Sequence, residues 1–193
     1  MDSTNLIIAL FVAITLSIVV LVVFYQNKNF VARLTRQAEK RGGEIRKGSF
    51  FKMTELRIPL KDVVIVIQTV PGSKHSPPKT IAQVKLDSPR LTAVRILRND
   101  LWQKTLTAFG KERSPTGDEE FDSQWVVQTE DPFIVQKLVT ADLKARLSER
   151  SLRSLDVRIQ PQEASFTITA IPSNDEGYDN FIDAVFFILE KTL

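Results

Sequence analysis

The sequence contains no cysteine and a single histidine, His75. Without cysteine the chain has no disulfide bond, no thiolate nucleophile and no cysteine-ligated metal, and it fits a reducing compartment. His75 lies in a proline-rich loop, and no side chain near it in the sequence is placed to orient it as a general base. We therefore interpret His75 as an exposed loop residue.

Motifs for phosphate binding and for nucleophilic catalysis are absent as well. The patterns GxxxxGKS/T, GxGxxG and GxSxG do not occur, and a single histidine cannot form HExxH. The sequence accordingly assigns no catalytic residue, no cofactor and no metal-ligand set. These absences favour a protein that is not an enzyme.

Positive charge is concentrated in one short stretch. Residues 26–47 carry seven Lys or Arg against two Glu, whereas residues 48–193 have a formal charge of −1. The pI of 9.2 therefore reflects this stretch rather than the rest of the chain. A nucleic-acid-binding domain shows a basic face, so no nucleic-acid partner is expected.

Leu6–Tyr25 is a run of 20 residues without a charge. A helix of this length spans about 30 Å, the thickness of the hydrocarbon core of a bilayer. A buried core helix is rarely this long and this apolar, and a cleaved signal peptide needs a basic start and a small-residue cleavage site that the chain lacks. We predict a transmembrane helix at residues 6–25, with the lipid bilayer as its partner.

The flanking charges predict the orientation of this helix. No Lys or Arg precedes it, and seven follow it within residues 26–47. By the positive-inside rule, residues 1–5 are an extracytoplasmic tail and the C-terminal part is cytoplasmic. The sequence thus predicts a single-pass protein of the plasma (inner) membrane.

Small residues recur every four positions in the apolar run, at Ala9, Ala13 and Ser17. Such a stripe allows two helices to approach closely, which would suit a homodimer. The alternative is that this spacing has no role in pairing, because Ala and Ser are common in membrane helices and the run contains no Gly. A homodimer or another protein partner is expected besides the bilayer.

Residues 26–43 are expected to continue the helix out of the membrane as a basic stalk that Gly42 and Gly43 end. A cation beside anionic headgroups contributes about 1 kcal/mol. The alternative is that these charges serve only to orient the helix. The side chains expected at the membrane surface are Lys28, Arg33, Arg36, Lys40 and Arg41.

Residues 44–193 are predicted to form one cytoplasmic α+β domain, in which helices pack on one face of an antiparallel sheet. The first four strands are expected at 51–60, 62–70, 80–86 and 91–97, and their short spacing predicts a meander. The apolar run VVIVIQTV predicts that the second of them is central. The later strands are expected at 121–129, 157–160 and 165–171, and the helices at 99–109, 131–139, 140–151 and 178–191.

An acidic loop, Thr116–Asp122, holds four carboxylates within five residues. Carboxylate oxygens bind hard cations, so Asp118 and Asp122 are candidates for a cation-dependent enzyme site. The alternative is turn chemistry, in which Gly117 adopts a left-handed backbone and Asp118 accepts a bond from the local backbone.

A second basic cluster follows this loop. It suits an acidic lipid or a partner, and a solvated helix face is the simpler interpretation. Its members are Lys144, Arg146, Arg150, Arg153 and Arg158.

The stretch from Gly117 to Leu147 reads GDEEFDSQWVVQTEDPFIVQKLVTADLKARL. It resembles a pattern in uncharacterised bacterial, often membrane-anchored proteins, where Gly-Asp and Phe-Asp precede a strand, an acidic helix start and an "LLT…L" helix pair. Leu138-Val139-Thr140 takes the place of the last motif here. The resemblance implies a bacterial domain of unknown function and no particular activity.

Three functions follow from these observations. The first is a membrane-tethered, non-catalytic interaction or scaffolding module. The second is a cation-dependent enzyme that uses the region of Asp118 and Asp122. The third is an anionic-lipid-sensing domain that uses the basic stalk and the second basic cluster.

Overall fold

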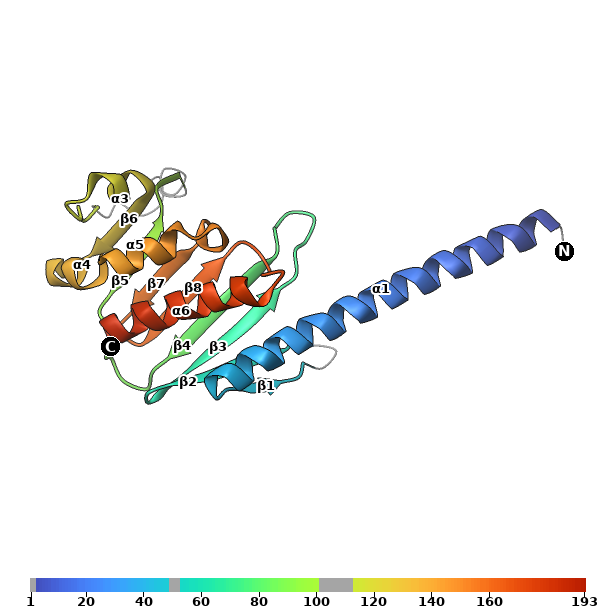
Figure 1. Ribbon diagram of the computed structural model, residues 1–193, viewed down its shortest axis with the longest axis horizontal. Coiled ribbons are helices and arrows are strands. Elements are labelled where there is room, and N and C mark those ends of the chain that lie inside the picture. The colour runs from blue at the N-terminus through green and yellow to red at the C-terminus, as the bar shows by residue number, and fades with distance from the viewer. Residues whose placement is uncertain (1–2, 49–52, 101–112) are drawn as a thin grey trace.

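One antiparallel sheet with helices against one of its faces forms the folded part of the chain (Figure 1). The computed structural model describes residues 3–48, 53–100 and 113–193. The strands are β1 Glu44–Arg46, β2 Glu55–Leu60, β3 Val63–Val70, β4 Lys79–Lys85, β5 Val94–Arg98, β6 Trp125–Thr129, β7 Asp156–Gln160 and β8 Glu163–Ile168. The helices are α1 Ser3–Arg41, α3 Glu119–Gln124, α4 Pro132–Leu138, α5 Ala141–Ser148, the 3-10 turn η1 Arg150–Leu152, and α6 Asp175–Thr192. The predicted α+β class is confirmed.

The order of the strands corrects the predicted four-stranded meander. Among the described residues the sheet runs β1-β2-β3-β4-β8-β7-β5-β6. The meander holds from β2 to β4, but β4 then pairs with β8, and β5 lies between β7 and β6. The spacing of strands in the sequence cannot reveal this arrangement, because the β7–β8 hairpin comes from about 60 residues further along the chain and inserts between β4 and β5.

Alternating side chains of the strands supply the sheet's half of the core. In β3, Val63, Ile65 and Ile67 are buried, and β3 lies between β2 and β4, as the apolar run predicts for an interior strand. In β7 and β8 the buried residues include Val157 and Phe166. The hairpin predicted from these two segments is confirmed, since Val157 and Phe166 are register partners.

Helix α6 packs along the sheet, as predicted for the C-terminal apolar stripe (Figure 1). Tyr178, Phe181 and Val185 are fully buried. The helix begins at Asp175, because the side chain of Asn174 caps it by accepting a hydrogen bond from the Gly177 N–H at 3.0 Å. The burial of these apolar side chains, rather than helix propensity, holds the 18 residues of α6 on the sheet.

The segment expected as one strand at 121–129 is a short helix followed by a strand. Phe121 belongs to α3, and only Trp125–Thr129 is β6. The strand prediction is wrong here because Asp118 caps a helical turn by accepting from the Phe121 N–H at 3.0 Å. The step of four from Phe121 to Trp125 fits a helical turn, and the step of two from Trp125 to Val127 fits a strand.

The next two predicted helices are present as α4 and α5. The Asp131 side chain caps α4 by accepting from the Phe133 N–H at 2.9 Å, and Thr140 caps α5. Leu143 and Leu147 point into the core, as predicted. The predicted helix at 99–109 lies for the most part outside the described residues, as do Phe51 and the start of the first predicted strand.

Helix α1 is a single element of 39 residues, about 58 Å long at the usual rise. Its first half projects past the edge of the sheet (Figure 1), and apolar side chains such as Phe11 and Leu16 are exposed there. Within the described residues, α1 is the one helix long and apolar enough to cross a membrane, judged by length and composition. Its last turns pack on the domain, so the apolar segment and the domain share one unbroken helix.

Candidate functional site

The last turns of α1 pack against the domain and α6, and we call this contact the anchor junction. It joins the segment of membrane-spanning length to the folded domain, and it contains the largest group of ion pairs between two helices in the described part of the chain. Its members are Leu34, Arg36, Gln37, Ala38, Lys40 and Arg41 of α1, and Asp175, Asp179 and Asp183 of α6.

Two small apolar contacts close the inner side of the junction. Leu34 and Ala38 are 2% and 5% exposed, and both belong to the main core. They lie one turn apart, so they share the face of α1 that meets β1, β2 and α6. Full burial of one leucine contributes about 2 kcal/mol, which makes α1 part of the domain rather than a free tether.

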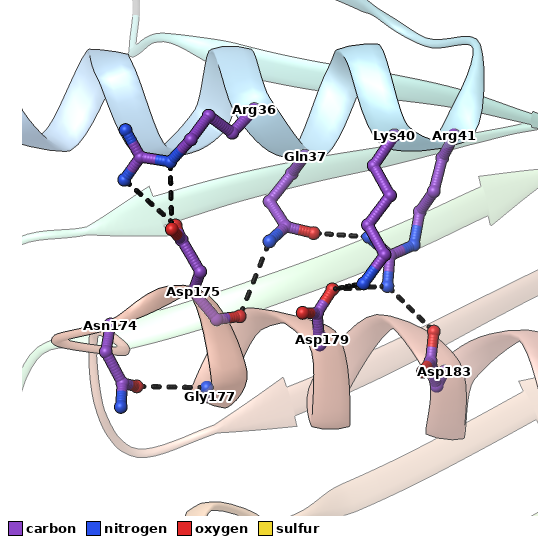
Figure 2. Close-up of polar contacts among 9 residues, drawn as sticks. All are labelled: Arg36, Gln37, Lys40, Arg41, Asn174, Asp175, Gly177, Asp179 and Asp183. Atoms are coloured by element: carbon purple, nitrogen blue, oxygen red, sulfur yellow. Dashed lines mark hydrogen bonds and ion pairs between the residues drawn. The ribbon is translucent and has the colours of Figure 1, made fainter.

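The polar side of the junction matches cations of α1 with carboxylates of α6 (Figure 2). Arg36 donates to both oxygens of Asp175, at 2.8 and 3.1 Å, and Lys40 donates to Asp179 at 2.9 Å. A step of four residues on α1 matches a step of four on α6, so the two helices run in the same direction. Spacing of four keeps each set of charges on one face of its helix.

Arg41 is the buried member of this group. Its side chain is 7% exposed, and its Nη2 lies 2.8 Å from carboxylate oxygens of both Asp179 and Asp183. Its Nη1 donates to the side-chain oxygen of Gln37, a buried residue whose own amide donates to the carbonyl of Asp175 at 3.4 Å. Arg41 thus joins two turns of α6 to α1 through one guanidinium (Figure 2).

The charges of the junction also suit the helix ends on which they lie. Lys40 and Arg41 are in the last turn of α1, where the helix dipole favours cations. Asp175 is in the first turn of α6, where the dipole favours anions. Burial alone would raise the pKa of Asp179, but hydrogen bonds from Lys40 and Arg41 outweigh it and hold that pKa below its ordinary value.

Two glycines end α1, as the sequence predicts. Gly42 has a φ of +63°, and the Gly43 N–H donates to the Ala38 carbonyl at 2.8 Å, which closes a Schellman-type cap. A Cβ on Gly43 would lie 2.4 Å from the carbonyl oxygen of Arg57 in β2. The chain therefore turns directly from α1 into β1 at the edge of the sheet.

The five cations expected at a membrane surface fall into two groups, those that pair with α6 and those that do not. Arg36, Lys40 and Arg41 bind carboxylates of α6, Lys28 is exposed, and Arg33 is half-buried with Nη1 3.5 Å from the Pro172 carbonyl oxygen. Contact of the five with lipid stays a prediction. The sequence analysis missed the α6 carboxylates, although their spacing of four, matching that of Arg36 and Lys40, is a signal that could have found them.

The acidic loop is occupied by local contacts. Gly117 has a φ of +83°, and Asp118 caps α3 and forms an ion pair with Lys144, which lowers the pKa of the Asp118 carboxyl. Asp122 accepts from the Thr116 N–H at 3.1 Å and from the Thr116 hydroxyl at 2.9 Å. Apart from the ion pair with Lys144 of α5, these are the contacts of turn chemistry. Within residues 3–48, 53–100 and 113–193, no group of three His, Asp or Glu is placed to hold a metal ion.

The other sequence candidates do not come together. His75 is exposed in the β3–β4 loop. In the second basic cluster, Lys144 pairs with Asp118, Arg146 lies over the Phe187 ring, and Arg158 pairs with Asp156. Arg158 alternates with the buried Val157 and so faces away from the helices, which separates it from the members on α5.

The architecture defines the class of the protein: an α+β domain joined without a linker to a helix of membrane-spanning length. No family model matches the chain, and no curated protein matches it. Among solved structures it is similar to the crystal structure of the mycobacterial trehalose monomycolate transport factor A, TtfA. The TM-score is 0.47 at 10% identity, with 85% of this chain and 96% of that chain covered. The likeness assigns no activity to this chain.

Proposed function

We propose that the protein is a single-pass, membrane-anchored interaction module without catalytic activity. In this proposal α1 crosses the plasma membrane of a bacterium and presents the α+β domain at the cytoplasmic face. The exposed apolar half of α1 and the excess of Lys and Arg that follows it support the anchor and its direction.

The anchor junction is the observation that carries the proposal. A protein that needs only to be kept near a membrane is served by a flexible linker. Here the helix continues from the apolar segment into the domain, where its Leu34 is buried and its Lys40 and Arg41 form a charge network with Asp179 and Asp183. Such a junction fixes the distance and the rotation of the domain relative to the bilayer, which is what a scaffold for a membrane partner requires.

Spin labels test the rigidity of the junction. The natural chain has no cysteine, so Lys28→Cys with Gln83→Cys gives one defined pair of labels on exposed sites of α1 and β4. The full chain in lipid nanodiscs is expected to give one narrow distance distribution by pulsed electron resonance. A broad distribution in the unaltered junction would show a flexible tether and contradict the proposal.

Two further measurements address anchoring and direction. The full chain is expected to stay with membranes after an alkaline carbonate wash, and alkaline phosphatase fused after Leu193 is expected to be inactive in a bacterial host. An active fusion would place the domain on the other side of the membrane. Cross-linking in intact cells, followed by recovery of one defined partner, would then support the interaction role.

A further inference from the structure

A groove of about 900 Å³ opens between α1 and the domain, next to the anchor junction. Its α1 wall includes Leu21, Val22, Tyr25 and Phe30, and Ile171 lies in its domain wall. Leu21 and Tyr25 are each 66% exposed and Ile171 is 37% exposed. Among the described residues that line the groove, Arg33 carries the charge.

The groove follows α1 from the apolar run into the polar stretch after it. Leu21 and Tyr25 belong to the segment of membrane-spanning length, and Arg33 lies eight residues beyond Tyr25, which is about 12 Å along a helix. The headgroup layer adds about 5–8 Å to each side of the hydrocarbon core. Because helical side chains lean toward the N-terminus, the Arg33 guanidinium reaches back toward headgroup level.

Arg33 differs from its neighbour one turn further along the helix. Arg36 is held by both oxygens of Asp175, whereas Arg33 forms no ion pair with a carboxylate of the described residues. One of its nitrogens lies 3.5 Å from the Pro172 carbonyl oxygen. A guanidinium has five N–H donors in a planar fork that suits phosphate, so Arg33 keeps donors for an anion in the groove.

We propose that this groove holds one anionic phospholipid of the adjoining leaflet. Its acyl chain lies against Leu21, Tyr25 and Ile171, and its phosphate accepts hydrogen bonds from Arg33. The proposal rests on the proposed function, because the groove lies beside lipid only if α1 crosses the membrane. A lipid is the occupant that matches both ends of the groove, since Leu21 and Tyr25 of the apolar run line one end and Arg33 lines the other.

The test uses the full chain in nanodiscs made of equal parts phosphatidylcholine and phosphatidylglycerol. After transfer to mild detergent, native mass spectrometry counts the lipids that each protein molecule retains. The unaltered chain is expected to retain one lipid, with phosphatidylglycerol preferred. Arg33→Gln is expected to reduce that preference about fivefold, the effect of one cation beside an anionic headgroup. Lys137→Gln, the loss of one charge at an exposed site on α4 that does not line the groove, is the control and is expected to alter nothing.

A second variant tests the apolar part of the site. Ile171→Trp fills the groove from an exposed position, so it is expected to reduce retention of both lipids while the domain stays folded. Equal preference for phosphatidylglycerol in Arg33→Gln and Lys137→Gln would overturn the lipid site and leave the anchor intact. Retention of a second protein chain in place of lipid would overturn it too. Release of the chain by the carbonate wash would instead refute the proposed function itself.

Discussion

Replacing Arg41 by alanine removes the guanidinium that joins α1 to two turns of α6. The side chain is 7% exposed and lies 2.8 Å from Asp179 and from Asp183. Hydrogen bonds to charged groups contribute about 1.5–3 kcal/mol each. Asp179 and Asp183 are 26% and 45% exposed, so water replaces part of the lost interaction. We expect Arg41→Ala to lower the free energy of unfolding by about 2–3 kcal/mol.

Equilibrium denaturation of the full chain in mild detergent measures this loss, with the spin-label pair on α1 and β4 as a second readout. Lys40→Ala is the matched control, because Lys40 binds the same Asp179 from a side chain that is 58% exposed. An exposed pair of this kind contributes about 0.2–1 kcal/mol. Arg41→Ala is also expected to broaden the distance distribution, whereas Lys40→Ala is expected to leave it narrow.

The comparison between Arg41→Ala and Lys40→Ala tests whether the buried Arg41 stabilises the fold and fixes α1 to the domain. Equal and small losses for Arg41→Ala and Lys40→Ala would mean that the burial of Arg41 adds nothing to the ion pairs. A large loss of stability with an unchanged distance distribution would mean that the network stabilises the domain without fixing α1. Either result would refute the role given to the anchor junction.

Three further predictions concern the ends of the junction and the acidic loop. Gly43→Ala is expected to cost about 1–3 kcal/mol in thermal or urea unfolding, since its Cβ would meet the Arg57 carbonyl oxygen at 2.4 Å, whereas Gly42→Asn, in open space at positive φ, is expected to be tolerated. Asp179 has a lowered pKa in the fold, so its contribution to stability is full above the unfolded pKa near 4 and is lost as the pH falls through the folded pKa. When unfolding is measured across acid pH, Asp179→Asn is expected to lose less stability on acidification than the unaltered chain. Asp122→Asn is expected to lower thermal stability by the same amount with and without Mg²⁺, because Asp122 binds Thr116, and a Mg²⁺-dependent shift confined to the unaltered chain would revive a cation site.

Local signals in the sequence predicted most of the elements correctly. Asp131-Pro132 and Thr140 mark helix starts that the structure retains, and the Gly42-Gly43 pair marks the end of α1. Each of these signals acts within about four residues, through a side chain or a backbone angle, so no tertiary partner is needed to read it. At Phe121 the predicted strand is wrong, because the Asp118 side chain caps a helix there.

The sequence by itself determined the apolar helix, its flanking charge and the α+β class, because periodicity, length and caps are properties of neighbouring residues. The tertiary structure decided which strands are neighbours and where the basic side chains are engaged. Arg36 and Asp175 are 139 residues apart in the chain. The spacing of four on each helix marks two charged faces, but it does not show that these two faces meet. The cations after the apolar run predicted a basic stalk at the membrane surface. The fold directs three of them to α6, because Leu34 and Ala38 pack into the core and bring that part of α1 beside the carboxylates of α6.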